Sequence, residues 1–502
     1  MKNFYFLLVL LSFVSTNSQN LGLDTTFGNN GVTIVPENSE SRVPITVLFE
    51  NNKYYLISLS NSIACINYNG SLDTTFGNMG KLILNEDNLN DNYIIKGVKL
   101  TNEYFYVFGQ KTNSYTSNKD GFVVKITMNG IYDANFGING KAIFNFGENE
   151  EEFNDIVINE FDEIFVAGTR ASKVILTKLN SNGTLDNSFD TNGYKIYTLN
   201  STEYYNIVNL YINNQELLFI GGSTGGALKK LILFKVQING NPITSFGNNG
   251  LKTAQLSGQG EFSGYTVEKS ILNTNNELYF SCYWSYSFSS QEKRLYKYNL
   301  NTDVLNQVTT LPLYYSHFTL DANNDIFTTG TYRCSPATSS NCPRNYQVFK
   351  KDSNGNIDTN FNSTGSFSYN FFPSDLISDD KSSSFYLHND GKIFLAGYVY
   401  NPYTINGTGI GLVRLSESSL SIEQEEKNQI IVYPNPASNM ILFKKSNDEI
   451  INKAIIYNTL GQKILEFNTN VSEINIEELQ SGLYSIELQI KDKKYINNFV
   501  KN

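Results

Sequence analysis

The same nine-residue phrase occurs twice near the start of this chain. Residues 23–31 read LDTTFGNNG and residues 72–80 read LDTTFGNMG. Weaker copies follow, and the six copies centre on the phenylalanines Phe27, Phe76, Phe136, Phe189, Phe246 and Phe361. Their spacings are 49, 60, 53, 57 and 115 residues, so a further copy has decayed inside the last interval, near residues 301–308. A period of this length predicts a repeat architecture before any other fold is considered.

Two further phrases recur seven times each along the same region. One is an Asn, Asp or Glu turn followed by an apolar strand, as in TNEYFYVFG, and the other is a closing strand, as in GFVVKITMN. Four short strands per unit, without helical periodicity, are typical of propeller blades. We therefore predict an all-β chain with a seven-bladed β-propeller over residues 19–415. Closing the ring removes the open ends that a linear array would expose.

We interpret the repeated phrase as the joint between the last strand of one blade and the first strand of the next. Its aspartate can bond nearby backbone amides of the turn, and its glycines can adopt positive φ. Its phenylalanine is expected to fill the gap between adjacent blades. Because Phe27 precedes the first blade, ring closure should bring residues 21–27 against the seventh blade.

The pattern L-D-x-x-F-G-x-x-G resembles the delta-60 repeat family of bacterial exported proteins, and the resemblance covers residues 22 to about 416. It implies a propeller-like repeat fold. It implies nothing about chemistry.

The first residues predict a signal peptide over residues 1–18. Lys2 precedes an apolar stretch from Phe4 to Val14, and small Thr16 and Ser18 fit a cut before Gln19. The alternative is a buried N-terminal strand or helix. No later segment approaches the roughly 20 apolar residues of a membrane helix, so no transmembrane segment is predicted.

The repeat stops near residue 416, and the last part of the chain has a different pattern. Residues 416–429 are polar and acidic, which predicts a linker. Seven short strand-like runs over residues 430–502 predict a small Ig-like β-sandwich.

This last part is similar to the C-terminal sorting domain of the type IX secretion system of Bacteroidetes. The similarity lies in Tyr433, Pro434, Asn435, Pro436, Gly461, Gln462, Ser481, Gly482, Tyr484, Phe499, Val500 and Lys501. It implies that type IX machinery is a partner and that the protein passes through the periplasm to be secreted or held on the cell surface. It also implies that this domain is often removed. The plainer interpretation is that the prolines protect a sheet edge and the glycines shape turns.

The net charge bears on the class of partner, and the cysteines bear on disulfide formation. The net charge of −10 and the absence of a basic run argue against nucleic acid as a partner. Cys334 and Cys342 flank a short loop between strand-like runs and are predicted to form a disulfide across a hairpin. Cys65 and Cys282 lie inside strand-like runs, where unpaired buried thiols are expected.

No catalytic constellation is evident, so we favour a non-enzyme and predict no catalytic or metal residues. His317 and His388 both lie in strand-like runs, where structural roles are expected, and no known catalytic motif occurs. No cofactor is predicted. Calcium is the alternative, because oxygen-bearing residues alternate at Asp186, Ser188, Asp190 and Asn192 and at Asp352, Asn354, Asn356 and Asp358. Neither loop has the downstream bidentate glutamate of a calcium loop.

The connections between the third and fourth strands of a unit are long and dissimilar, which predicts a recognition face. The candidate ligand-binding side chains there are Tyr115, Trp284, Tyr286, Phe288, Tyr332, Arg333 and Tyr403. Aromatic, Asn and Ser side chains suit sugar rings, although self-packing of the loops is the alternative. We predict a secreted or cell-surface module that binds a glycan or a surface protein. The alternatives are a secreted polysaccharide-degrading enzyme and a structural spacer without a specific ligand.

Overall fold

The computed structural model describes residues 21–502 except 37–43, 59–60, 85–90, 114–116, 148–149, 172, 201–202, 224–229, 257–265, 288–289, 313, 332–344, 373–379, 401–407, 418–430, 445–449, 459–461, 469 and 492. The predicted signal peptide therefore lies outside the described residues. The chain divides into two compact units, Met1–Ser418 and Ser419–Asn502. Within the described ranges every regular element is a β-strand, which confirms the all-β prediction, and no helix is long and apolar enough to cross a membrane.

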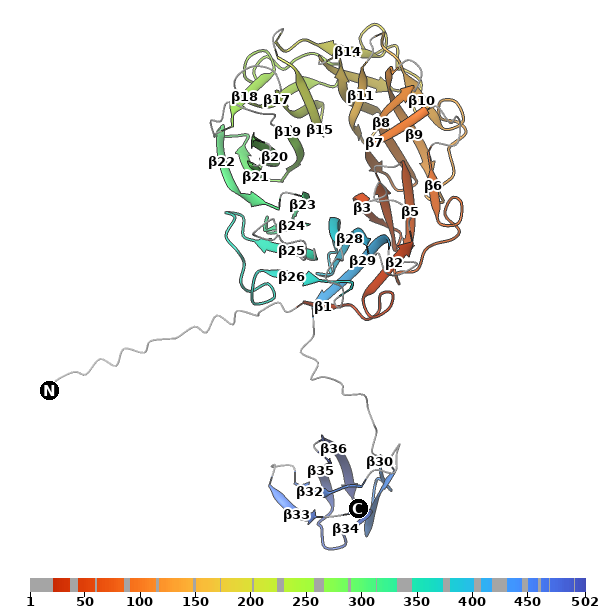
Figure 1. Cartoon of the computed structure of the whole chain (residues 1–502), viewed down its shortest axis with the longest axis vertical. Helices are drawn as coiled ribbons and strands as arrows, with labels where there is room; N and C mark the ends of the chain where they lie inside the picture. Colours follow the sequence, from red (N-terminus) through yellow and green to blue (C-terminus); the bar gives the residue numbers. More distant parts are fainter. Residues whose placement is uncertain are drawn as a thin grey trace, which may run out of the picture. The chain divides into compact units, whose positions relative to one another are not determined.

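The first unit contains seven sheets that follow one another around a common centre (Figure 1). Three antiparallel sheets come first in the sequence. The first sheet contains β3 (Pro44–Glu50), β4 (Lys53–Ser58), β5 (Ser62–Asn67) and β6 (Lys81–Ile83). The second contains β7 (Asp91–Leu100), β8 (Tyr104–Asn113), β9 (Lys119–Thr127) and β10 (Lys141–Phe144). The third contains β11 (Glu151–Ile158), β12 (Ile164–Arg170), β13 (Lys173–Leu179) and β14 (Tyr194–Tyr197).

The next three sheets have the same four-stranded order. The fourth sheet contains β15 (Tyr205–Asn213), β16 (Glu216–Ser223), β17 (Lys230–Gln237) and β18 (Leu251–Gln255). The fifth contains β19 (Thr266–Leu272), β20 (Glu277–Ser287), β21 (Ser290–Asn299) and β22 (Val304–Leu311). The sixth contains β23 (Tyr314–Leu320), β24 (Ile326–Thr331), β25 (Tyr346–Lys351) and β26 (Ser366–Tyr369). In each of the six, every strand pairs antiparallel with its neighbour in sequence.

The last sheet combines both ends of the unit. It consists of β27 (Lys381–Leu387), β28 (Ile393–Tyr400), β29 (Thr408–Glu417), β1 (Leu21–Leu23) and β2 (Val32–Pro36). Both N-terminal strands pair antiparallel with β29, beside which they lie in Figure 1. Leu23 is opposite Leu415, and Val32 is opposite Val413. The expected contact of residues 21–27 with the last sheet is thus confirmed.

The predicted position of the repeated phrase was wrong by one strand. The phrase lies inside a sheet, between its third and fourth strands, as residues 72–80 lie between β5 and β6. The Asp73 amide donates to the Cys65 carbonyl, so the phrase folds back on its own third strand and returns the chain to pair beside it. Neighbouring sheets are instead joined by the segment between a fourth strand and the next first strand.

The aspartate of the phrase does form the expected turn. Asp24 Oδ1 accepts the Thr26 amide at 3.0 Å, and the same contact recurs at Asp73, Asp133, Asp186 and Asp358. A cation on the third strand pairs with the same carboxylate, which sequence reasoning had not foreseen. These ion pairs are Lys125–Asp133 at 2.9 Å, Lys178–Asp186 at 3.1 Å, Lys350–Asp358 at 3.0 Å and Arg414–Asp24 at 2.8 Å.

The phenylalanine of the phrase packs between two sheets. The Phe27 ring lies 5.7 Å from that of Phe394 in the last sheet and 6.3 Å from that of Tyr54 in the first. Phe76, Phe136 and Phe189 belong to buried clusters that likewise draw residues from two consecutive sheets. Each apolar core of the unit is therefore an interface between neighbouring sheets.

The second unit has two sheets and its own core. One contains β30 (Ile431–Tyr433), β31 (Met440–Lys444) and β34 (Glu473–Asn475), and the other contains β33 (Lys463–Asn468), β32 (Lys453–Tyr457), β35 (Gly482–Ile490) and β36 (Lys493–Lys501). Both contribute to one buried cluster, with Ile441 from one and Ile486 from the other. Because β29 continues to Glu417, residues 416 and 417 belong to the first unit and not to the predicted linker.

Ring closure depends on Arg414, which is 0% exposed in the side chain. Its guanidinium donates to Asp24 Oδ2 at 2.8 Å, to Thr26 Oγ1 at 2.9 Å and to the Tyr68 carbonyl. It thereby joins β29, the N-terminal segment and the first sheet. Burial alone would raise the pKa of Asp24, but hydrogen bonds from Thr26 and the charge of Arg414 bring it below its usual value.

We expect Arg414→Met to lower the free energy of unfolding of the first unit by about 3–5 kcal/mol, because it leaves the buried Asp24 carboxylate without its cation. Chemical denaturation followed by the fluorescence of Trp284, the single tryptophan, measures this loss. The control is Lys392→Met, which removes an ion pair with the exposed Asp390 and should cost less than about 1 kcal/mol. Equal losses for the two variants would contradict the assigned role of Arg414.

Candidate functional site

Regular junctions between sheets are sealed by a glycine turn. This glycine stands five residues after the third-strand cation, and it packs against the phenylalanine of the preceding sheet. A β-carbon on the glycine would lie 2.9 or 3.0 Å from that ring at Gly130 on Phe76, Gly183 on Phe136 and Gly240 on Phe189. Real β-carbons rarely approach so closely, and all three glycines have positive φ, so the contact favours glycine at these positions.

The junction between the fourth and fifth sheets departs from this rule. Thr302 stands five residues after Lys297, where five of the other six sheets have glycine and the last sheet has Ser419. A side chain at this position cannot enter the close contact with Phe246, and Thr302 is exposed. Phe246 is accordingly half-buried, whereas the other five phenylalanines of the phrase are at most 4% exposed.

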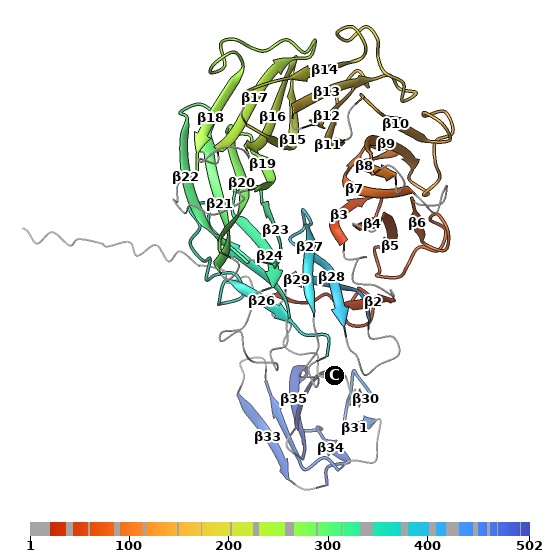
Figure 2. The same cartoon turned by 45° about the horizontal axis from the view of Figure 1, so that its top comes forward.

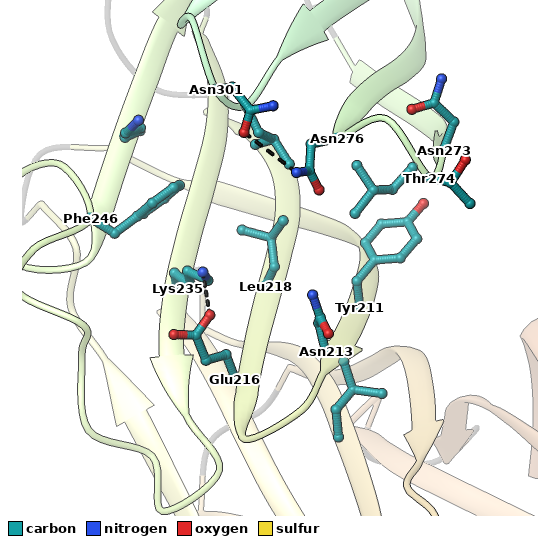
Figure 3. Close-up of a pocket in the computed structure, with 14 residues that line it drawn as sticks. Tyr211, Asn213, Glu216, Leu218, Lys235, Phe246, Asn273, Thr274, Asn276 and Asn301 are labelled. Carbon is teal, nitrogen blue, oxygen red and sulfur yellow. Dashed lines mark hydrogen bonds and ion pairs between the residues drawn. The ribbon is translucent and has the colours of Figure 1, made fainter.

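A pocket of about 620 Å³ lies at this junction (Figure 3). The apolar and aromatic residues that line it include Tyr211, Ile212, Leu218, Phe246, Leu272 and Leu300. The residues with amide side chains are Asn213, Asn273, Asn276 and Asn301. In Figure 3, Asn276 and Asn301 approach each other at the top of the view, with Leu218 and Tyr211 below them. The volume falls within the range of small-molecule sites, roughly 300–1,000 Å³.

The amides of the pocket differ in how far the protein occupies them. The Asn273 side chain is already hydrogen-bonded within the protein. Its oxygen accepts hydrogen bonds from the Asn275 and Glu277 backbone amides, and its nitrogen donates to Asn324 at 3.0 Å. Asn276 Nδ2 makes a long contact of 3.4 Å with Asn301 Oδ1. These two amides therefore keep donor and acceptor capacity for a polar ligand.

The charged groups beside the pocket are paired with each other. Lys235 pairs with Glu216, and Lys252 pairs with Asp303 at 2.6 Å while lying 4.7 Å from the centre of the Phe246 ring. Hydrogen bonds from Lys252 and from Tyr298 lower the pKa of Asp303. Burial raises the pKa of Tyr211 to about 12, so its phenol stays neutral at physiological pH. The pocket is thus polar but balanced in charge.

Most of the predicted ligand-binding side chains cannot be compared with this pocket. Tyr115, Phe288, Tyr332, Arg333 and Tyr403 lie outside the described residues, as do both cysteines of the predicted disulfide, Cys334 and Cys342. Trp284 and Tyr286 lie in β20. The pocket is formed by turns at one end of the strands, whereas the long connections lie at the opposite end. Sequence reasoning therefore missed it. The decayed phrase near residues 301–308 was the signal that could have found it.

The structure assigns partners to other residues singled out in the sequence. His388 Nε2 lies 2.7 Å from the Tyr54 hydroxyl, which fits the expected structural role. Cys65 and Cys282 are free and buried, as expected, and burial raises the pKa of the Cys65 thiol to about 12. His317 contacts Lys269 at 2.6 Å in the central cavity described below.

The two loops weighed for calcium are built as turns. Asp186 Oδ1 accepts the Ser188 hydroxyl, and Asp352 Oδ1 accepts the Asn354 and Asn356 amides at 2.9 and 2.8 Å. Across the described part of the chain, no group of three or more His, Cys, Asp and Glu side chains could hold a metal ion.

The second unit ties its first motif to its last strand through Asn435. Asn435 Oδ1 accepts the Val500 amide at 2.9 Å, and Asn435 Nδ2 donates to the Asn498 carbonyl at 3.1 Å. Tyr433 is exposed, and both prolines of the motif follow cis peptide bonds. The remaining motif positions are Pro434, Pro436, Gln462, Ser481, Gly482, Tyr484 and Lys501, while Gly461 lies outside the described residues.

Residues 431–502 match the family described as the secretion system C-terminal sorting domain. The chain carries a type IX sorting domain. Residues 162–189 match a second family, described as a domain of unknown function (DUF5122) beta-propeller. The sorting domain means that the protein is handled by the type IX machinery and is secreted or held at the outer-membrane cell surface. The first unit is accordingly a propeller carried outside the cell.

Comparisons with solved structures give weaker likenesses. Catalytically inactive virginiamycin B lyase from Staphylococcus aureus with quinupristin has a TM-score of 0.41 and 11% identity, and covers 77% of this chain and 98% of its own. BamB from Moraxella catarrhalis has a TM-score of 0.35 and 10% identity, with coverages of 76% and 99%. These values carry no argument about function. No curated protein matches the chain.

The contact between glycine and phenylalanine predicts that substitutions at equivalent positions of two sheets change the free energy of unfolding by different amounts. Gly240→Ala should lower the free energy of unfolding by about 1–3 kcal/mol, because the new methyl group meets Phe189 and Gly240 has a φ of 81°. Thr302→Ala, at the matching position of the fifth sheet, should change it by less than about 0.5 kcal/mol. Denaturation followed by Trp284 fluorescence measures both. A large cost for Thr302→Ala would show that the fifth sheet is sealed after all.

Proposed function

We propose that the first unit is a closed seven-bladed propeller that binds a neutral glycan outside the cell, in the pocket between its fourth and fifth sheets. The observation that carries this proposal is the amide-rich pocket at the junction where Thr302 replaces the glycine and Phe246 is half-buried. We further propose that the sorting domain is an Ig-like sandwich, which is supported by its two sheets around one core.

The chemistry of the lining supports a sugar ligand. Hydroxyl groups of a sugar both donate and accept hydrogen bonds, and so do the amides of Asn276 and Asn301. The apolar faces of sugar rings can pack on half-buried aromatic groups, here Phe246. Because the neighbouring charges are paired, a neutral ligand leaves no ion without a partner.

The same geometry favours binding over hydrolysis. A glycosidase requires two carboxyl groups placed on either side of the scissile bond. The carboxylate that lines this pocket, Glu216, pairs with Lys235, and Asp303 beside the pocket pairs with Lys252. A surface-protein ligand, a spacer without a ligand and a polysaccharide-degrading enzyme are the alternatives that the experiment below separates.

Binding is tested on a panel of neutral oligosaccharides with the full chain. We expect Asn301→Ala and Phe246→Ala each to weaken binding about tenfold, since one hydrogen bond or one aromatic contact contributes about 1 kcal/mol. Isothermal titration measures the affinity, and Trp284 fluorescence checks folding. The control is Asn135→Ala, an exposed asparagine in a regular phrase, which should leave affinity unchanged.

Three results would overturn this assignment. No binding to any neutral oligosaccharide would favour a protein ligand or a spacer. Equal affinity of Asn301→Ala and the parent chain would move the ligand elsewhere. Turnover of a polysaccharide that is lost on carboxylate substitution would establish an enzyme.

Deleting residues 431–502 should leave the protein in the periplasm, because the sorting domain is what the type IX machinery handles. Cell fractionation and immunoblotting measure its distribution. The first unit should stay folded, since the two units have separate cores. Truncated protein recovered outside the cell in the parent amount would contradict the role of this domain.

A further inference from the structure

A second cavity, of about 590 Å³, lies at the centre of the ring. It is lined from the first strand of every sheet, namely β3, β7, β11, β15, β19, β23 and β27. Figure 1 and Figure 2 show these strands closest to the middle of the first unit. Since every sheet contributes to it, this central cavity exists only in the closed ring.

Most charged groups around the central cavity have a counterpart. Lys96 pairs with Glu152 at 2.9 Å, and Lys293 pairs with Glu268. Asp155 Oδ2 accepts the Leu210 amide at 2.8 Å and the Asn209 side-chain amide at 3.2 Å, so it joins β11 to β15. These groups are explained by the fold.

Lys269 is the exception. Its ammonium lies 2.6 Å from Nε2 of His317 and 5.7 Å from the centre of the Phe318 ring, and among the described residues no carboxylate lies within ion-pair distance of it. Burial and the nearby Lys293 lower the pKa of Lys269 to about 7. Burial and both lysines also lower the pKa of His317, which keeps the ring neutral. An anion bound here would supply the missing countercharge.

An unused acceptor lines the same cavity. Asn154 Nδ2 donates to Glu152, but Asn154 Oδ1 is buried and has no hydrogen-bond partner. A buried carbonyl oxygen without a donor is costly, and this oxygen is closed to solvent. Rotation of the Asn154 side chain toward the cavity would let the oxygen accept a ligand hydroxyl. The lining also includes the hydroxyl groups of Thr46, Ser281 and Thr319. The cavity thus combines one cation for an acid with polar groups for hydroxyls.

We propose that the central cavity binds a hydroxylated carboxylic acid of the uronic acid class, with its carboxylate on Lys269 and a hydroxyl on Asn154. This site is separate from the pocket for neutral sugars and does not depend on it. A peptide carboxylate would satisfy Lys269 but bring no hydroxyl for Asn154, so the uronic acid fits both observations.

Isothermal titration of the full chain at pH 6 with galacturonate, galactose, acetate and triglycine tests the site. We expect galacturonate to bind at least tenfold more tightly than each of the others. Lys269→Met should weaken galacturonate binding at least tenfold, and Lys269→Arg should retain it. Asn154→Ala should weaken galacturonate binding about threefold to tenfold and leave acetate binding unchanged. Lys392→Met is the control, because Lys392 lines neither cavity and should have no effect.

The pH dependence gives an independent readout. Only the protonated Lys269 attracts the carboxylate, so affinity should fall as pH rises through about 7. Asp155 acts in the same direction, because burial raises its pKa to about 6 and its negative charge appears above that value. His317 stays neutral throughout, and Lys96 and Lys293 keep their carboxylate partners.

Several results would overturn the proposal. Galacturonate binding that survives Lys269→Met would place the ligand elsewhere. Equal affinity for triglycine would favour a peptide ligand, and equal affinity for acetate or an unchanged Asn154→Ala variant would remove the hydroxyl contact. Should Lys269→Met fail to fold, loss of galacturonate binding in Lys269→Arg would count against the site in its place.

Discussion

The antiparallel pairing of β1 and β2 with β29 is the constraint on which the rest of the first unit depends. A sheet of this ring has no core of its own, because its apolar side chains pack against the sheets before and after it. A ring that stayed open would leave two such faces in water. The buried Arg414–Asp24 ion pair, formed between residues 390 positions apart, fixes this closure and contacts the first sheet as well. Closing the ring also creates the central cavity, since all seven sheets line it.

A second constraint is the contact of a glycine turn with a phenylalanine, which is made by Gly130, Gly183 and Gly240 at three junctions. Within the phrase itself, the aspartate forms the turn and the phenylalanine fills the space between two sheets. The contact leaves little room for a side chain on these glycines. Thr302 replaces the glycine in the fifth sheet, and Phe246 beside it is the one half-buried phenylalanine among the six of the phrase. At this junction the departure from the repeat coincides with a local pocket.

Much of this fold could be predicted from the sequence. The period and its seven recurrences indicated the sheets, and the placement of Phe27 before them indicated the closing strands. The seven strand-like runs expected over residues 430–502 correspond to the seven strands β30 to β36 of the described residues. The sequence does not show which sheet the strand after the phrase belongs to. Its local propensity is the same whether it pairs with the strand before the phrase or with the next strand in sequence. The pocket and the Lys269–His317 contact join residues far apart in sequence, and no local pattern marks them.

The closing contact also bears on how the first unit reaches its folded state. Strands β3 to β26 pair with neighbours in sequence, whereas β2 must find β29 across almost the whole unit. Contacts of such long sequence separation carry a large entropic cost before they contribute stability, so they form late. Until then the faces that later meet around Phe27 remain exposed, and the charge of Arg414 has no partner. A chain that is exported before it closes therefore has a period in which its two ends must stay available to each other, and the polar segment at residues 418–430 separates that closure from the folding of the sorting domain.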